Sequence, residues 1–351
     1  MKSKLPYVIF GCIFALSACG GSSADGAPPP VQVPPPAPPP PPSPPPPPAP
    51  PPTSIEREIA PSLTGPGFIG SQSPHIAINP GPATAARGKL FVMLPGTFAV
   101  PRTYRLITRT APTQGFHAIG LTYPNDEAIE GLCGSSNDPD CAGRARREVI
   151  TGEDTSPLVA IDTNNSIINR LRALLIYLRS NFPGEGWDQY LNGNEPVWSR
   201  ITVAGHSQGG GHAGFLGKLF SLDRIAMFSS PGDTGVAPGS PAQWLSLPNI
   251  TPASRQYGFT HTRDPLIPQS VATVNWGALG LGAFGGTVSV DGASSPFSNS
   301  HQLLTSAAPN PNPTGPTASP EHGAPVVDSV TPLNNAGEPI FRNVWIYMAF
   351  S

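Results

Sequence analysis

Charged residues are scarce in this chain of 351 residues. Asp, Glu, Lys and Arg make up 12% of it, about half of the share that is usual in soluble proteins. The formal net charge at pH 7 is −2, so the chain lacks a strong electrostatic field that would attract a polyanion. This balance argues against a nucleic-acid-binding protein.

A membrane-spanning apolar run is also lacking at the N-terminus. The run from Leu5 to Leu16 is too short to cross a bilayer as a stable helix, and the composition argues against a polytopic membrane protein. Hydrophobic residues still make up 38% of the chain, and the roughly 300 residues after Pro52 can bury a large core. A fully disordered chain is therefore excluded as well.

The N-terminus has the form of a secretory signal, because two lysines precede the short apolar run. The run ends in Leu16-Ser-Ala-Cys-Gly20, which resembles the lipobox of bacterial lipoproteins. That resemblance implies that residues 1–18 are removed and that Cys19 is acylated as the new N-terminus. The alternative is an ordinary signal peptide that happens to end in a cysteine.

A lipid anchor on Cys19 would attach the protein to a bacterial membrane without a transmembrane helix. Gly20 follows the cysteine in place of an aspartate, which favours the outer membrane. Nineteen of the 49 prolines then lie between Pro28 and Pro52. Polyproline II extends by about 3.1 Å per residue, so this tract can act as a spacer of roughly 75 Å. A docking peptide for an aromatic groove is the alternative. The sequence predicts a linker over 19–54 and a folded domain over 55–351.

Cysteine is rare, and its placement agrees with export. Of four cysteines, Cys12 lies in the signal and Cys19 carries the lipid. Cys133 and Cys141 remain, separated by seven polar, turn-rich residues. In an oxidising compartment such a pair predicts a disulfide, with free thiols as the alternative. A metal site would need further ligands close by, and the local sequence has none.

The folded part alternates between strand and helix patterns. Short apolar runs predict strands at residues 89–94, 116–122, 200–204, 224–228 and 256–260. A helix is expected over 99–114, and apolar residues at helical spacing between 167 and 178 predict a second. Such alternation predicts an α/β fold, with a mostly parallel sheet covered by helices on both faces. Residues 124–162 are expected to form an irregular, polar insertion that shapes or covers the pocket.

One motif carries chemistry. Gly205-His-Ser-Gln-Gly209 directly follows the predicted strand Ile-Thr-Val-Ala and opens a stretch of small residues. A serine at this place sits on a strained strand-to-helix turn, where flanking glycines leave room for neighbouring backbone. The helix after it directs N–H groups at developing negative charge. Ser207 is therefore the candidate nucleophile, and an ordinary glycine-rich turn is the alternative.

The segment Arg200–Phe220 resembles the nucleophile elbow of the α/β-hydrolase superfamily, which includes esterases and lipases. The resemblance covers roughly residues 85–350 and is specific at the elbow. It implies an eight-stranded, mostly parallel sheet, and a catalytic triad in the chain order serine, acid, histidine. Such chemistry needs no metal and no organic cofactor. The resemblance also implies an oxyanion hole made by the N–H groups of Thr97 and Gln208, unless Pro95-Gly-Thr97 is a plain turn.

Two aspartates compete for the role of the acid. Asp264 follows a late strand and precedes Pro-Leu-Ile-Pro, as in the acid turn of the superfamily. Asp233 follows the preceding strand and is the rival. We favour Asp264 because it lies one strand later, and its alternative role is to cap a turn or pair with Arg263.

The histidine is found by elimination among seven: His75, His117, His206, His212, His261, His301 and His322. Only His301 and His322 follow Asp264. His301 opens the predicted last strand, whose start lies on the side of the sheet opposite the active site, whereas His322 lies in an exposed loop beyond that strand. If residues 287–290 formed the last strand, His301 would take the role. We favour His322.

These residues predict a serine hydrolase that cleaves carboxylic esters through an acyl-enzyme. The expected substrate is a small-molecule or lipid-like ester at the cell envelope. A serine amidase or peptidase would use the same residues. A surface lipoprotein that binds ligands on a hydrolase scaffold without catalysis is a further alternative.

Overall fold

The computed structural model describes residues 54–311 and 319–351. The predicted signal peptide, Cys19 and the proline tract of 28–52 lie outside the described residues. Within those two ranges, no helix has both the length and the apolarity that crossing a bilayer requires.

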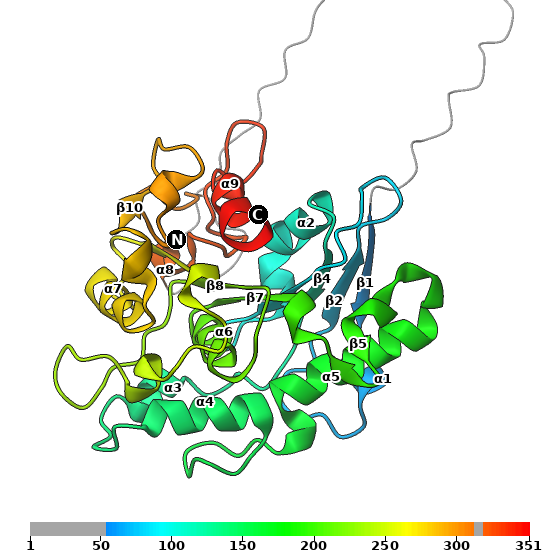
Figure 1. Ribbon diagram of the computed structural model, residues 1–351, viewed down its shortest axis with the longest axis horizontal. Coiled ribbons are helices and arrows are strands. Elements are labelled where there is room, and N and C mark those ends of the chain that lie inside the picture. The colour runs from blue at the N-terminus through cyan, green and yellow to red at the C-terminus, as the bar shows by residue number, and fades with distance from the viewer. Residues whose placement is uncertain (1–53, 312–318) are drawn as a thin grey trace, which may run out of the picture. The chain divides into compact units, whose positions relative to one another are not determined.

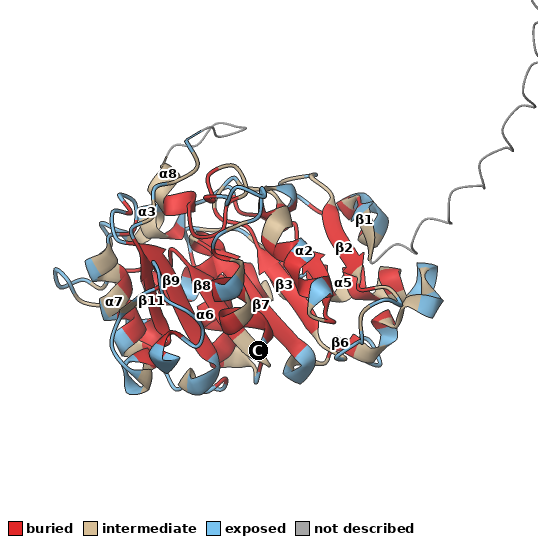
Figure 2. Cartoon of the chain, turned by 90° about the horizontal axis from the view of Figure 1, so that it is seen from above, coloured by how far each residue is buried: buried red, intermediate tan, exposed pale blue. Residues whose placement is uncertain are grey.

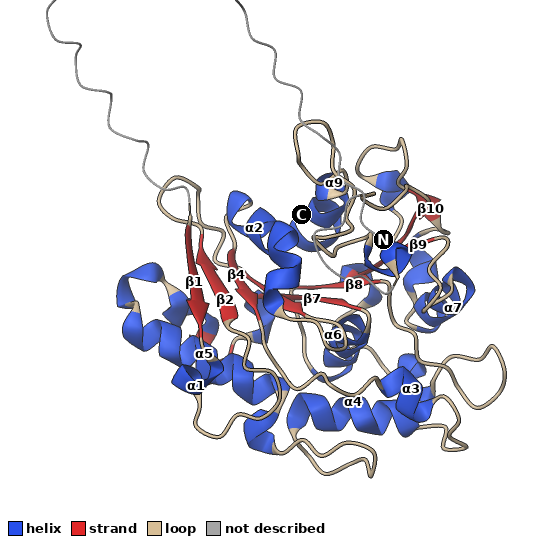
Figure 3. Ribbon diagram, turned by 180° about the vertical axis from the view of Figure 1, so that it is seen from behind, coloured by secondary structure: helices blue, strands red, loops and turns tan. Residues whose placement is uncertain are grey.

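A nine-stranded sheet forms the centre of the domain, and Figure 3 shows its strands from behind. In spatial order the strands are β1 (Ile55–Ile59), β2 (His75–Asn79), β4 (His117–Gly120), β3 (Leu90–Leu94), β7 (Ile201–His206), β8 (Arg224–Phe228), β9 (Gln256–His261), β11 (Gln302–Thr305) and β10 (Val288–Ser289). β2 runs antiparallel to both of its neighbours, and the other pairs are parallel. This sheet confirms the predicted α/β class. It has one strand more than the eight implied by the resemblance, and a small hairpin, β5 (Leu191–Asn192) with β6 (Glu195–Pro196), lies apart from it.

The central strands are apolar on both faces because helices cover both. Successive side chains of a strand point to opposite faces. Leu90, Val92 and Leu94 of β3 accordingly belong to one hydrophobic cluster, while Phe91 and Met93 belong to another. Figure 2 shows the resulting band of buried strands through the middle of the domain.

Two sets of helices supply the rest of these clusters, and Figure 1 shows them on opposite sides of the sheet. The first set is α4 (Cys141–Thr151), α5 (Ile167–Asn181), α6 (Gln208–Leu219) and α7 (Gln269–Ala278). The second is α2 (Arg105–Thr113), α9 (Arg342–Trp345) and the last helical turn, Ile346–Phe350. Three short helices, α1 (Pro61–Thr64), α3 (Ile129–Cys133) and α8 (Pro320–Gly323), lie in connections.

Several expected elements are confirmed with shifts of a few residues at their ends. The helix expected between 167 and 178 is α5, and β11 is the last strand along the described residues, as the preference for His322 assumed. The insertion of 124–162 is not wholly irregular, because it contains α3 and α4. The predicted Cys133–Cys141 disulfide is present and joins these two helices. Strands β1 and β2 were not predicted.

The parallel strands end at a common edge, and this positions the site. β3 leads into Thr97, β7 into Ser207 and β9 into Asp264, and the chain after β11 leads to His322. In open α/β sheets, ligands bind beyond the carboxyl ends of the strands. All five predicted site residues therefore lie in segments that follow this edge: Thr97, Ser207, Gln208, Asp264 and His322.

Candidate active site

Ser207 occupies the sharp turn between β7 and α6. Its backbone has φ 54° and ψ −124°, a region that costs non-glycine residues about 1–3 kcal/mol and occurs mostly at functional sites. The glycines around it are required by close packing. A Cβ on Gly205 would lie 2.1 Å from the carbonyl oxygen of Gly209, and one on Gly209 would lie 2.2 Å from that of Leu94. The packed turn thus holds Ser207 in its strained conformation.

His322 and Asp264 are joined directly. Nδ1 of His322 lies 2.8 Å from Oδ2 of Asp264, and both side chains are almost fully buried. His322 lies on α8 and is 6% exposed, so the expectation of an exposed loop is wrong. Burial favours a specific hydrogen bond here because little water competes for the imidazole.

The Asp264 carboxylate is held from both sides. Its other oxygen, Oδ1, accepts hydrogen bonds from the N–H groups of Leu266 and Ile267, at 2.9 and 3.0 Å. Burial by itself would raise the Asp264 pKa, but the His322 hydrogen bond and these two N–H groups outweigh burial and lower it. The carboxylate therefore stays ionised and fixes the orientation of the imidazole.

The two rival residues lie in other surroundings. Asp233 forms a buried, two-pronged ion pair with Arg146 and accepts a hydrogen bond from Trp244. His301 precedes β11 and stacks on the ring of Tyr257 at 4.0 Å, with Nδ1 3.2 Å from the carbonyl of Ala253. The arrangement therefore pairs Asp264 with His322 and leaves both rivals in structural contacts.

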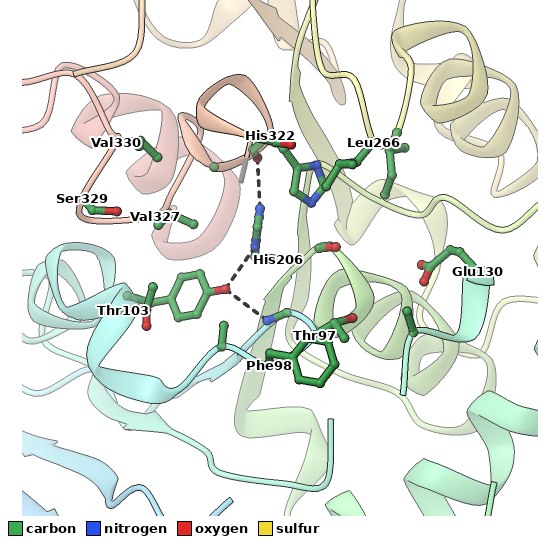
Figure 4. A pocket seen from close by; sticks show the side chains of 18 residues that line it. Thr97, Phe98, Thr103, Glu130, His206, Leu266, His322, Val327, Ser329 and Val330 are labelled. Carbon is green, nitrogen blue, oxygen red and sulfur yellow. Dashed lines mark hydrogen bonds between the residues drawn. The ribbon is translucent and has the colours of Figure 1, made fainter. Parts of the chain in front are cut away.

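A cavity of about 500 Å³ opens where these segments meet. Ser207, His322 and Thr97 line it, and Figure 4 shows Thr97 and His322 facing it from opposite sides. Gly96 brings the strand end close to the serine, since a Cβ there would lie 3.2 Å from the Cβ of Ser207. Nucleophile, histidine and strand end thus share one cavity.

The two N–H groups implied for the oxyanion hole are available. Within residues 54–311 and 319–351, neither the N–H of Thr97 nor that of Gln208 donates a hydrogen bond to the protein. The side chains of the same residues are joined, because Thr97 Oγ1 donates to Gln208 Oε1 at 3.1 Å. Gln208 Oε1 also accepts from the N–H of Ile129 on α3. These side-chain contacts hold the two backbone segments beside the serine, while their N–H groups have no hydrogen-bond partner among the described residues.

His206, next to the serine, connects two parts of the site. The Tyr104 hydroxyl accepts a hydrogen bond from the N–H of Gly96 at 3.1 Å and lies 3.0 Å from His206 Nδ1. Nε2 of His206 lies 3.0 Å from the carbonyl oxygen of His322, which also accepts from the Ser229 hydroxyl. Burial, followed by repulsion from His322, lowers the His206 pKa to about 3. His206 is thus neutral, so it donates through Nε2 and accepts through Nδ1.

Arg146 of α4 supports the elbow from behind. Its guanidinium is fully buried and donates to the carbonyl oxygen of Gln208 at 3.0 Å, to Asp233 and to Glu130. A Cβ on Gly211 would lie 2.3 Å from this guanidinium. The Gly-Gly-Gly run after Ser207 therefore makes room for an arginine as well as for backbone.

Sequence reasoning missed Tyr104, His206, Arg146 and Glu130. Arg146 and Glu130 lie in the insertion that was expected to be irregular, on the two helices joined by the disulfide. The sequence signal for this region was Arg146-Arg147, two adjacent arginines close to the predicted disulfide in a chain that is poor in charged residues. Tyr104 carried no sequence signal, because only the fold brings it to His206.

Within the described ranges, no group of three or more His, Cys, Asp or Glu side chains is placed to bind a metal ion.

Comparisons with known proteins add little to this geometry. No family model matches the chain, and no curated protein is significantly similar to it. Among solved structures, the chain is similar to one from Klebsiella pneumoniae that carries the name dienelactone hydrolase. The identity is 15% and the TM-score 0.34, over 72% of this chain and 85% of the other. We therefore derive the function from the residues of this chain.

Proposed function

We propose that this protein is a serine hydrolase of the α/β-hydrolase superfamily that cleaves carboxylic esters. The observation that carries the proposal is one arrangement: a serine held at φ 54° at the edge of a cavity that it shares with a histidine bonded to a buried carboxylate. A strained turn persists only where packing maintains it, and catalysis is the common reason for such strain.

In the proposed reaction, Ser207 Oγ attacks the ester carbonyl and its proton passes to Nε2 of His322. Asp264 holds the imidazole through Nδ1 and stabilises its protonated form. The N–H groups of Thr97 and Gln208 bind the oxygen that becomes negative. The carbon–oxygen bond to the alcohol then breaks, and the alcohol leaves with the proton from His322. Water hydrolyses the acyl-enzyme by the same steps.

A fluorophosphonate probe tests this directly, because it phosphonylates an activated serine and leaves an ordinary serine unmodified. We expect labelling of wild-type protein, none of Ser207→Ala, and reduced labelling of Asp264→Asn. Hydrolysis of 4-nitrophenyl butyrate and of the matching 4-nitroanilide then separates ester from amide cleavage. Absence of labelling in folded wild-type protein would support the ligand-binding alternative, and a faster anilide reaction would support an amidase.

We further propose that the protein acts at the bacterial cell envelope, held at the outer membrane by lipid on Cys19. The lipobox-like sequence and the proline-rich spacer after it support this. The disulfide agrees with a compartment that is oxidising.

A further inference from the structure

The cavity has one charged wall. Among the described residues that line it, Glu130 is the only Asp, Glu, Lys or Arg. Figure 4 shows Glu130 on the same side as Leu266, whereas Val327, Ser329 and Val330 lie on the other side of His322 and Thr97. The proposed reaction centre thus lies between two sides of the cavity: the valine side, with Val327, Ser329 and Val330, and the Glu130 side, with Glu130 and Leu266.

The charge of Glu130 is not fully compensated. Glu130 forms an ion pair with Arg146, at 2.9 Å. The same guanidinium, however, also donates hydrogen bonds to both carboxylate oxygens of Asp233, and the side chains of Arg146 and Asp233 are fully buried. One cation therefore faces two anions, which leaves a formal charge of −1 on the cluster. The Glu130 side chain is 24% exposed, so the excess charge is accessible from the cavity.

Electrostatics around Glu130 favour an incoming cation. Burial raises the Glu130 pKa, Arg146 lowers it, and Asp233 raises it further, with a net increase. A raised carboxyl pKa means that the surroundings disfavour the negative charge. A positive group placed in the cavity would stabilise the ionised Glu130 carboxylate. The apolar lining would strengthen the attraction between the two charges by excluding water. No lysine or arginine lines the cavity among the described residues, so an anionic substrate would find no partner there.

We propose that Glu130 selects esters that carry a cationic ammonium group. The ammonium group binds on the Glu130 side of the cavity, beside Leu266, and the valine side takes an uncharged chain. The proposal rests on the ester hydrolase function proposed above. Glu130 acts in it as a specificity residue for one end of the substrate, at a distance from the bond that breaks.

Isosteric pairs of esters test this. Choline butyrate and 3,3-dimethylbutyl butyrate differ only in a charged nitrogen on the alcohol side. The 4-nitrophenyl esters of 4-(trimethylammonio)butyric and 5,5-dimethylhexanoic acid make the same comparison on the acyl side. At pH 8, we expect wild-type protein to prefer the cationic ester of one pair by about tenfold in kcat/KM, which corresponds to about 1.4 kcal/mol.

Variants then assign the preference. Glu130→Gln should bring the ratio close to one. Glu130→Asp, which withdraws the charge by one methylene, should lower it without abolishing it. Glu153→Gln is the matched control, because Glu153 is exposed and pairs with Arg147 outside the cavity. Since the two esters of a pair share the same catalytic groups, their ratio does not respond to a general loss of activity.

Failure of this inference can be told apart from failure of the proposed function. Hydrolysis of both esters of each pair without cationic preference, or an unchanged ratio in Glu130→Gln, overturns the role of Glu130 and leaves the hydrolase intact. If Glu130→Gln does not fold, the wild-type and Glu130→Asp ratios decide. If none of the four esters is cleaved and the fluorophosphonate does not label Ser207, the hydrolase proposal itself is wrong.

Discussion

At the scale of single residues, the site depends on small numbers of fixed contacts. His322 and Asp264 are 58 positions apart in the chain, yet they are joined by one hydrogen bond of 2.8 Å. Ser207 keeps a strained backbone in a turn where neighbouring glycines let backbone segments pack too closely for any side chain. Changes of a few atoms should therefore have large and selective effects on turnover.

His322 and His301 provide a comparison between two equally buried histidines, each 6% exposed. We expect His322→Ala to reduce kcat/KM on 4-nitrophenyl butyrate by at least about 10³-fold, because no group remains to take the serine proton. His301→Ala should cost stability by removing a stacked ring, and should change kcat/KM by only a few-fold. Circular dichroism and thermal melting check that both variants fold. A dead His301→Ala beside an active His322→Ala would reassign the base.

Tyr104 is expected to position the site through His206. Tyr104→Phe removes the hydroxyl that holds the Gly96 N–H and lies against His206. The Gly96–Thr97 turn and the His322 segment then lose a common anchor, so kcat should fall by about tenfold while KM changes little. Loss of a buried hydrogen bond should also cost about 1–3 kcal/mol in the free energy of unfolding.

Tyr190→Phe is the matched control for that variant. The Tyr190 hydroxyl is also bonded to a histidine, His117, and to a backbone carbonyl, but it lies away from the cavity. We expect a similar loss of stability and an unchanged kcat. Equal losses of kcat in both variants would show that Tyr104 matters for the fold alone.

At the scale of elements, α3 and α4 build one wall of the site. α3 carries Glu130 to the cavity and α4 carries Arg146 to the elbow, and the Cys133–Cys141 disulfide connects the two helices. α3 has only five residues, too few to be stable by itself. The disulfide therefore holds a short helix in the position that the cavity requires.

Removing this disulfide should destabilise the protein. Closing a loop of this length is worth about 2–3 kcal/mol in the free energy of unfolding, so the double variant Cys133→Ser/Cys141→Ser should lose that amount in urea titrations. Reduction of wild-type protein should shift the unfolding midpoint equally and leave the variant unaffected. Mass spectrometry that finds two free thiols in the exported protein would contradict the expectation.

At the scale of the whole molecule, buried histidines make folding sensitive to acid. His75 is fully buried, and its Nδ1 accepts a hydrogen bond from the N–H of Thr122. Burial, followed by repulsion from Arg170, lowers the His75 pKa from 6.5 to about 3. Below pH 6.5 the unfolded chain binds a proton there that the folded chain does not bind until the pH approaches 3. The free energy of unfolding therefore decreases as the pH falls across this window.

His75→Asn tests this contribution, because the Asn oxygen can still accept from Thr122 and does not titrate. Relative to pH 7.5, wild-type protein should lose about 2 kcal/mol more than the variant at pH 5. Urea unfolding at both pH values measures the difference. At pH 7.5 and 8.5 the gap between the two proteins should stay constant, and a gap that is also constant down to pH 5 would refute the assignment.

The proposed lipid anchor on Cys19 gives a prediction for the chain that carries its N-terminal segment. Cys19→Ala should release the protein from membranes or leave its signal uncleaved, because acyl chains on Cys19 are the proposed attachment. Phase separation in Triton X-114 measures this, with wild-type protein in the detergent phase and the processed variant in the aqueous phase. Unchanged partitioning of the variant would contradict lipidation of Cys19.

The sequence by itself determined the alternation of strands and helices and the position of the strained serine. Both are local properties. The strand before Ser207 is a continuous apolar run, the turn needs glycines at fixed offsets, and α5 repeats its apolar residues at helical spacing. β1, β2, α3 and α4 were missed or misjudged, because β1 (Ile-Glu-Arg-Glu-Ile) and β2 (His-Ile-Ala-Ile-Asn) lack a long, continuous apolar run and the two helices lie in a segment rich in polar residues.

Only the tertiary structure shows which partners the rival residues have. Asp264 and Asp233 each follow a strand at the same edge of the sheet, and the sequence favoured Asp264 only because its strand comes later and Pro-Leu-Ile-Pro follows it. In the folded protein Asp233 forms an ion pair with Arg146, whereas Asp264 forms a hydrogen bond with His322. The cavity and its Glu130 wall likewise depend on contacts between distant segments, because a hydrogen bond or an ion pair requires closeness in space, which separation along the chain does not specify.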